Sequence, residues 1–130
     1  MEGLNTWFPI RKGIFARTAG YVKAVNGVSF TMKAGETLGV VGESGCGKST
    51  LSRTILRLEK PHDGRIRFEG QDVFALRGKA LQQYRRDMQV VFQDPHATLN
   101  PRHSVLDILT EGMLVHGLIK PSEAQDVAAG

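Results

Sequence analysis

The phosphate-binding pattern G-x-x-x-x-G-K-[ST] constrains this chain more than any other feature, and residues 42–50 satisfy it at every position. Glycines let the backbone adopt angles closed to other residues and come close to a ligand. The loop predicts a site for the phosphates of a nucleotide triphosphate, with a lysine at the β- and γ-phosphates and a serine hydroxyl on Mg²⁺. The candidate residues, in order, are Gly42, Glu43, Ser44, Gly45, Cys46, Gly47, Lys48, Ser49 and Thr50.

The two flanks of this loop decide whether the pattern can work. A strand must lead in and a helix must leave, because the loop and helix amides have to converge on one set of phosphates. Residues 37–41 form a short apolar run, which predicts a strand buried in a parallel sheet. Leu51, Ile55 and Leu58 form one apolar stripe, which predicts an amphipathic helix ending before Pro61. An α/β fold follows, and the alternative is a glycine-rich turn with a solvated lysine.

A second segment narrows the choice among proteins with such a loop. Residues 89–93 predict another strand, which ends in a polar loop at Gln93 and is stopped by Pro95. Alone, Gln93 could simply be a hydrogen-bonding residue at the end of a strand. A phosphate-loop kinase would also need an acceptor site and a lid, and the sequence shows neither.

Four segments carry a resemblance to a known family. They are VKAVNGVSF at 22–30, GESGCG at 42–47, FQDP at 92–95 and LNPR at 99–102. With them the chain resembles the nucleotide-binding subunits of ABC transporters, and more narrowly the oligopeptide/dipeptide permease ATPases, from about Leu4 to its last residue. The phosphate loop looks like their Walker A, and Val91-Phe92-Gln93 looks like their Q-loop.

The resemblance implies an ATP-binding subunit that powers import of peptides or related small solutes. Its cofactors would be ATP and Mg²⁺. Lys48 and Gln93 would be the catalytic residues, and Ser49 and Gln93 the metal ligands. An amide suits the position of Gln93, since it can accept and donate hydrogen bonds while it stays neutral.

The family also places an aromatic platform for adenine before the phosphate loop. Trp7, Phe8 and Tyr21 stand there, and any of them offers a flat π surface. Phe8 is the first choice, because it precedes Pro9 at the end of a predicted first strand, with residues 10–20 as a loop insertion after it. Tyr21 is the second choice, and for each residue the simpler alternative is an ordinary packed aromatic.

The remaining patterns predict short strands followed by helices. Strands are expected at 22–25, 28–32 and 65–68, with a turn at 33–36 before the phosphate-loop strand. A basic helix is expected at 78–87. Another helix should begin after Ser104, where Asp107 completes a capping box with Asp in the usual place of Glu or Gln.

These elements match the first part of one ABC nucleotide-binding domain. About 1–95 would be the β subdomain and P-loop core, and about 96–130 the Q-loop exit and the start of the helical subdomain. No Walker B strand, signature motif or switch histidine is recognisable. The chain is therefore expected to be an incomplete N-terminal part that offers only the Walker A half of a site shared between two domains. Without a Walker B neighbour, the exposed apolar edge predicts marginal stability and a tendency to associate.

The partners implied by the resemblance are ATP, transmembrane permease subunits and a second nucleotide-binding subunit in a homo- or heterodimer. Residues 94–102 would meet the permease. The alternative is a truncated, non-hydrolysing piece that binds nucleotide weakly or serves only as an interaction module with the permease. On either hypothesis this chain alone is expected not to hydrolyse ATP.

Charge and composition exclude several other functions. The 17 basic and 13 acidic residues give +4, and the basic residues are scattered, so no nucleic-acid partner is expected. The single cysteine, Cys46, cannot form a disulfide scaffold or a zinc cluster within one chain. No signal peptide opens the chain, and no apolar stretch approaches about 20 residues. A cytoplasmic protein, peripheral on the inner face of the cell membrane, is expected.

Overall fold

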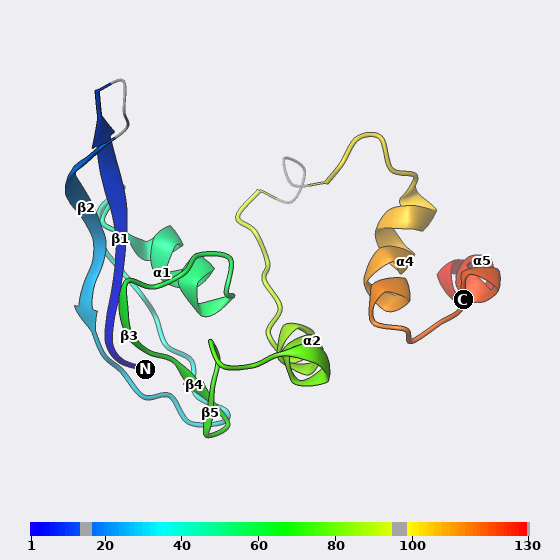
Figure 1. Cartoon of the computed structure of the whole chain (residues 1–130). Coiled ribbons are helices and arrows are strands. Elements are labelled where there is room, and N and C mark those ends of the chain that lie inside the picture. The colour runs from blue at the N-terminus through cyan, green and yellow to red at the C-terminus, as the bar shows by residue number, and fades with distance from the viewer. Residues whose placement is uncertain (14–16, 95–98, 130) are drawn as a thin grey trace. The chain divides into compact units, whose positions relative to one another are not determined.

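The computed structural model describes residues 1–13, 17–94 and 99–129 (Figure 1). The chain divides into two compact units, Met1–Tyr84 and Arg85–Gly130, and each is described by itself. The predicted division near residues 95 and 96 falls outside the described residues, so it stays a prediction.

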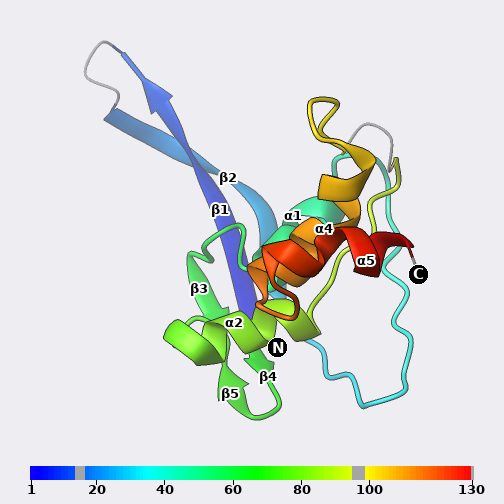
Figure 2. The same ribbon diagram turned by 90° about the vertical axis from the view of Figure 1, so that its right-hand side faces the viewer.

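The first unit is built on an antiparallel sheet of three strands, β1 (Glu2–Lys12), β2 (Arg17–Val28) and β3 (Asp63–Arg65). Their order is β2-β1-β3, so β1 lies between a long partner and a short one. Figures 1 and 2 show that the far end of the β1–β2 hairpin projects beyond α1 (Lys48–Ile55). The predicted antiparallel β subdomain is confirmed.

The hairpin is longer than the sequence suggested. Phe8 pairs with Val22, and the ladder continues through Pro9 with Tyr21 and Ile10 with Gly20. The prediction that β1 ends at Phe8 and that a loop insertion covers 10–20 is therefore wrong. A proline is tolerated inside a strand where its nitrogen faces an unpaired edge, and β3 pairs with β1 only at Glu2 and Asn5.

α1 packs against the sheet through its buried side. Leu51 and Thr54 are its buried residues, and Leu4 of β1 and Val25 of β2 are buried as well. The hydroxyls of Thr54 and Thr6 lie 3.0 Å apart and are both buried. The predicted helix after the phosphate loop is confirmed, and a polar pair joins it to β1.

α1 ends earlier than its apolar stripe predicted. The Leu58 N–H donates to Arg53 O and the Arg57 N–H to Thr54 O, which is the hydrogen-bond pattern of a Schellman motif. Arg57 has φ 62°, in the left-handed region that usually selects glycine. Leu58 therefore lies outside the helix and is 66% exposed, so its predicted place on the buried stripe is wrong.

A second small sheet and most of a helix complete the first unit. β4 (Arg67–Phe68) and β5 (Gln71–Asp72) form a hairpin whose turn residues, Glu69 and Gly70, both have positive φ, as a type I′ turn requires. Part of the predicted strand at 65–68 is thus divided between β3 and β4. The basic helix is confirmed as α2 (Gly78–Asp87).

Tyr84 of α2 is the residue that ties this helix to α1. It is almost fully buried, and its hydroxyl donates to Ile55 O. Its ring meets Phe68 edge-on at 5.4 Å. Burial raises the pKa of the Tyr84 phenol, and the Arg57 guanidinium opposes part of that rise.

The second unit holds α4 (Val105–Val115), a 3₁₀ turn η1 (Pro121–Glu123) and α5 (Ala124–Ala129). The predicted capping box is confirmed, since Ser104 Oγ accepts from Asp107 N at 3.1 Å and Asp107 Oδ2 accepts from Ser104 N at 3.0 Å. Two hydrogen bonds to its carboxylate, from Ser104 Oγ at 2.7 Å and from Ser104 N, lower the pKa of Asp107. Within the described ranges, no helix has both the length and the apolar character to cross a bilayer.

Three predicted strands are not formed in the described residues. β2 ends at Val28, although Phe30 N still donates to Met1 O at 3.1 Å. Residues 37–41 and 89–93 have no strand structure, and Val41 and Val91 are each 93% exposed. A strand of a parallel sheet is stable only when neighbours satisfy its backbone groups on both sides. These strand predictions are wrong for the structure described, and the loop is entered from an unpaired segment.

Candidate functional site

Gly47 fixes the phosphate-binding loop against the sheet. It has φ 99° and stands directly before α1. A Cβ at this position would lie 2.0 Å from the backbone oxygen of Ala24 in β2, far inside contact distance. Only glycine fits here, so a backbone contact sets where α1 begins.

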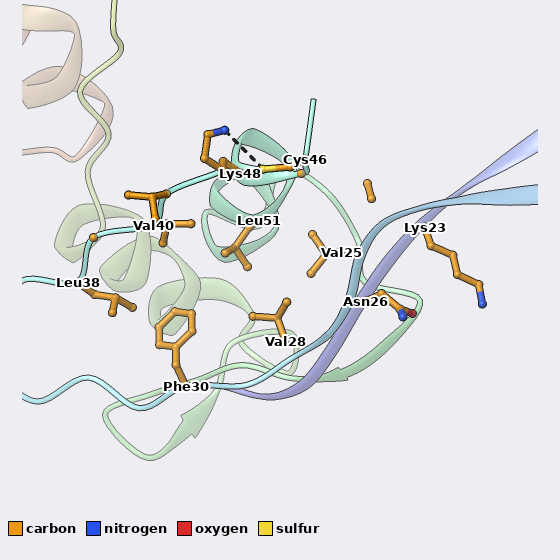
Figure 3. A pocket seen from close by; sticks show the side chains of 14 residues that line it. Lys23, Val25, Asn26, Val28, Phe30, Leu38, Val40, Cys46, Lys48 and Leu51 are labelled. Carbon is orange, nitrogen blue, oxygen red and sulfur yellow. Dashed lines mark hydrogen bonds between the residues drawn. The ribbon is translucent and has the colours of Figure 1, made fainter. Parts of the chain in front are cut away.

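The Lys48 side chain folds back over the loop. Its ammonium donates to Gly42 O and to Glu43 O, each at 2.6 Å, and lies 3.5 Å from Cys46 Sγ (Figure 3). The charge is thus held by backbone carbonyls of the loop itself. An ammonium in this position can meet an anion that the loop surrounds.

The N-terminus of α1 carries no side-chain cap. Its N-cap, Gly47, has no side chain to donate or accept, and the first turn contains no acidic residue. The first amides of a helix have no partner within the helix, and they carry its partial positive charge. Ser49 is exposed there and Thr50 is half-buried. Amides, an ammonium and a hydroxyl oxygen therefore gather at one end of α1, which favours an anion.

An apolar cavity of about 640 Å³ borders the loop, with Cys46, Gly47 and Lys48 among its lining. Figure 3 shows its apolar side chains converging from β2, from the unpaired segment and from α1, while Lys23 points away from them. The loop thus borders an apolar space in place of the parallel sheet that the sequence predicted around it. The converging side chains are Val25, Val28, Phe30, Leu38, Val40 and Leu51.

The aromatic candidates for adenine divide between the two faces of the hairpin. Thr6 bonds to Thr54, so its side of β1 faces α1. Alternation along the strand puts Phe8 on the same side as Thr6 and Trp7 on the other. The Tyr21 ring lies 6.1 Å from that of Trp7, so Tyr21 belongs to the face away from α1. Phe8, 37% exposed, is the candidate on the side of α1.

Gln93 belongs to the second unit and is exposed there. Its predicted part in catalysis and metal binding stays a prediction. Pro95 and part of the predicted permease-binding segment 94–102 lie outside the described residues. Among the described residues, no group of three His, Cys, Asp or Glu side chains could hold a metal ion.

Sequence reasoning missed the contacts that hold the loop in place. The Thr6–Thr54 pair and the Ala24 carbonyl against Gly47 join residues far apart in sequence. The only available signal in the sequence was Thr54, a threonine on the buried side of the predicted helix. Its partner on β1 could not be identified without the register of the sheet.

Comparison with known proteins agrees with this geometry. The sequence profile of the ABC transporter family matches residues 25–129, which include the loop and α1. The oligopeptide transport ATP-binding protein AppF of Bacillus subtilis is 49% identical over 127 residues, or 97% of this chain and 39% of that protein. The glutathione import ATP-binding protein GsiA of Pectobacterium atrosepticum is 48% identical over 96% of this chain and 20% of its own length.

A third relative is a probable peptide ABC transporter ATP-binding protein of Sinorhizobium fredii. It is 47% identical over 98% of this chain and 36% of its own length. The chain thus spans well under half the length of these curated relatives. The profile, however, covers most of the chain and takes in the phosphate-binding loop, α1 and the segment around Gln93. The chain belongs to the ABC transporter family.

Proposed function

We propose that this chain contributes the phosphate-binding part of an ATP-binding subunit that powers import of peptides or related small solutes. The observation that carries the proposal is the Lys48 ammonium, held over the loop by Gly42 O and Glu43 O at the uncapped start of α1. Its relatives are described as ATP-binding proteins of oligopeptide transport and glutathione import. Peptide and glutathione share the chemistry of short amides, which supports this class of solute.

The loop residues 42–50 would bind the phosphates of ATP in this proposal. The loop amides and Lys48 would hold the β- and γ-phosphates, and the Ser49 hydroxyl would supply one oxygen to Mg²⁺. The exposed hydroxyl fits this ion, since Mg²⁺ prefers oxygen ligands and takes most of them from phosphates and water. Bound Mg²⁺ would neutralise phosphate charge.

Phe8 would stack on adenine, and what supports it over Tyr21 is its place on the face of the hairpin that carries α1. Gln93 would orient a ligand of the metal or the attacking water through its amide. The complete protein would hydrolyse ATP together with a second nucleotide-binding subunit. It would sit on the cytoplasmic face of the membrane, held there by transmembrane permease subunits.

The alternative is a non-hydrolysing piece that binds nucleotide weakly or only engages the permease. The observation that favours it is the unpaired segment 37–41, since Val41 is 93% exposed and the described residues provide no strand on that side of the loop. The two functions share one loop and differ in what happens after nucleotide has bound.

Calorimetry of Mg-ATP binding to the 130-residue chain tests the proposal, with Lys48→Ala as the loop variant and Lys79→Ala on α2 as the matched control. Lys48→Ala should weaken binding by about a hundredfold, because charge-assisted hydrogen bonds are worth about 1.5–3 kcal/mol each. Lys79→Ala should bind as the parent does. Equal affinity in all three proteins would contradict a phosphate site at the loop. Phosphate release in the same samples separates hydrolysis from binding alone.

A further inference from the structure

The outer face of the three-stranded sheet gathers three rings and one cation in one patch, the aromatic face, made of Trp7, Tyr21, Lys23 and His62. The Trp7 and His62 rings are stacked at 4.2 Å with an 18° angle between their planes. Tyr21 lies 5.7 Å from His62, and the Lys23 ammonium lies 4.7 Å from the centre of the Trp7 ring. Two paired strands, β1 and β2, and the residue before β3 thus present one continuous surface.

This surface is turned away from α1. Trp7 pairs with Lys23 and Pro9 with Tyr21 across the hairpin, and cross-strand partners share a face. Thr6, on the opposite face, is the residue that bonds to α1. Tyr21 is 48% exposed, and Lys23 and His62 are exposed as well.

One polar group on the aromatic face lacks a partner. The indole Nε1 of Trp7 is buried and has no hydrogen-bond acceptor among the described residues. A buried donor without an acceptor costs about 1–3 kcal/mol. A ligand that brings an oxygen to this edge of the ring would remove that cost.

The charge around the aromatic face is mainly positive. From Gly3 to Gly35 the sequence contains no acidic residue and five cations. Arg11 stands two positions beyond Pro9, so alternation puts it on the same face as Trp7. Asp63, next to His62, is the exception, because it pairs with Asn5, two positions before Trp7, which puts its carboxylate on the same face and leaves Lys23 and Arg11 in excess there. The five cations are Arg11, Lys12, Arg17, Lys23 and Lys33.

We propose that the aromatic face is a docking surface for an acidic segment of a partner polypeptide. Tryptophan, tyrosine and arginine are enriched at protein interfaces and supply much of their binding energy. Carboxylates would meet Lys23 and Arg11, and a carbonyl or carboxylate oxygen would accept from Trp7 Nε1. This docking is independent of the nucleotide site proposed above.

The ring geometry favours a polypeptide over nucleic acid or a membrane. Bases stack on open aromatic faces, but His62 already covers one side of Trp7, and Lys23 lies over the ring. An anionic membrane is entered by apolar side chains that project into it, and here the large rings pack on one another. Oxygen acceptors at the rim of the rings fit this arrangement better.

Trp7 is the only tryptophan of the chain, so its fluorescence reports on this face directly. Titration with a glutamate homopeptide should change the Trp7 emission in a saturable way that weakens with salt. Lys23→Glu should weaken binding by about tenfold. Lys79→Glu, which makes the same charge change on α2, should bind nearly as the parent does. Tyr21→Ala, which keeps every charge, should also weaken binding, and circular dichroism checks that each variant is folded.

Three outcomes would overturn the proposal. One is an equal loss of affinity in Lys23→Glu and Lys79→Glu, which would reveal only general charge attraction. Another is an unchanged Trp7 emission at saturating peptide. The third is tighter binding of oligothymidylate, or of vesicles of phosphatidylcholine and phosphatidylglycerol, than of the peptide. None of these outcomes depends on ATP binding at Lys48, so the two proposals can fail separately.

Discussion

α1 and α4 are built alike except at their first turn. Each contains a buried threonine that donates to the carbonyl four residues earlier, Thr54 to Thr50 O at 2.7 Å and Thr110 to Leu106 O at 2.8 Å. Both end in the Schellman pattern, with Arg57 or Gly117 in the left-handed position. α4 begins with a capping box, whereas α1 begins with a glycine and no side-chain cap.

The two helices differ in which group interacts with the partial positive charge of their first turn. α4 supplies its own, because the Asp107 carboxylate accepts from Ser104 N at its first turn. α1 has no acidic residue there, and the ammonium of Lys48 adds positive charge. A self-capped helix is closed to anions, while an uncapped one keeps its amides for a ligand. α1 must then be stabilised by contacts elsewhere along its length.

The largest effect is expected from Gly47→Ala, which tests why α1 cannot carry a cap. The new Cβ would lie 2.0 Å from Ala24 O, at a φ of 99°. Clash and backbone strain together should cost about 3 kcal/mol of unfolding free energy. Gly45→Ala is the control, since a Cβ there meets no atom within 4 Å, and its positive φ alone should cost about 1 kcal/mol. Urea unfolding followed by circular dichroism measures both, and equal losses would contradict the contact with Ala24.

A smaller effect is expected where α1 is anchored to the sheet. Thr54→Val should cost about 2 kcal/mol, because it leaves the buried Thr6 hydroxyl without its partner. Thr110→Val in α4 is the matched change, and it should cost about 1 kcal/mol or less, since only a bond within the helix is lost. The same unfolding experiment compares them. If Thr110→Val costs as much as Thr54→Val, the Thr6 contact does not anchor α1.

The Schellman motifs that end α1 and α4 allow a comparison of smaller effects. Arg57 tolerates its positive φ while its guanidinium donates to Leu76 O at 3.0 Å. Arg57→Ala keeps the strain and loses that bond, so it should cost about 1 kcal/mol, and Arg57→Gly should cost less. Gly117→Ala should cost about 1 kcal/mol, since it adds strain where glycine had none. Equal stability of Arg57→Ala and Arg57→Gly would show that the backbone angle is not strained.

The smallest effect is a pH dependence confined to α4. Hydrogen bonds from Ser104 lower the pKa of Asp107 below its unfolded value. This contribution to stability is therefore present above the unfolded pKa and is lost as pH falls through the lowered folded pKa. NMR of the Asp107 carboxyl carbon follows the titration, with Asp107→Asn as the control. α1 has no acid in its first turn, so a matching change at its amides over that range would contradict the comparison.

Local patterns predicted these helices well, and strands poorly. The phosphate loop, α1 and the Ser104–Asp107 box depend on residues within a few positions of one another. Strands 37–41 and 89–93 were predicted from apolar runs, but a strand is completed only by neighbours distant in sequence. Arg57 was missed for the opposite reason, since its side chain compensates a backbone angle that normally selects glycine.

The candidate site could be predicted only in part for the same reason. The sequence identified Lys48, and the motif contained its loop partners, Gly42 and Glu43. It could not tell Phe8 from Tyr21, because the hairpin register decides which face each ring occupies. The sequence also predicted that the first strand ends at Phe8, because the next residue, Pro9, cannot donate a backbone hydrogen bond.

Pro9 has a consequence for how far the sheet can grow. β3 covers β1 only at Glu2 and Asn5, so most of that edge of β1 is left without a neighbour in the described residues. An open edge invites another strand, but a proline offers no N–H to a newcomer. Edge-to-edge polymerisation of the hairpin is thereby discouraged. Copies of this chain that do adhere should meet through the apolar runs around Val41 and Val91 instead.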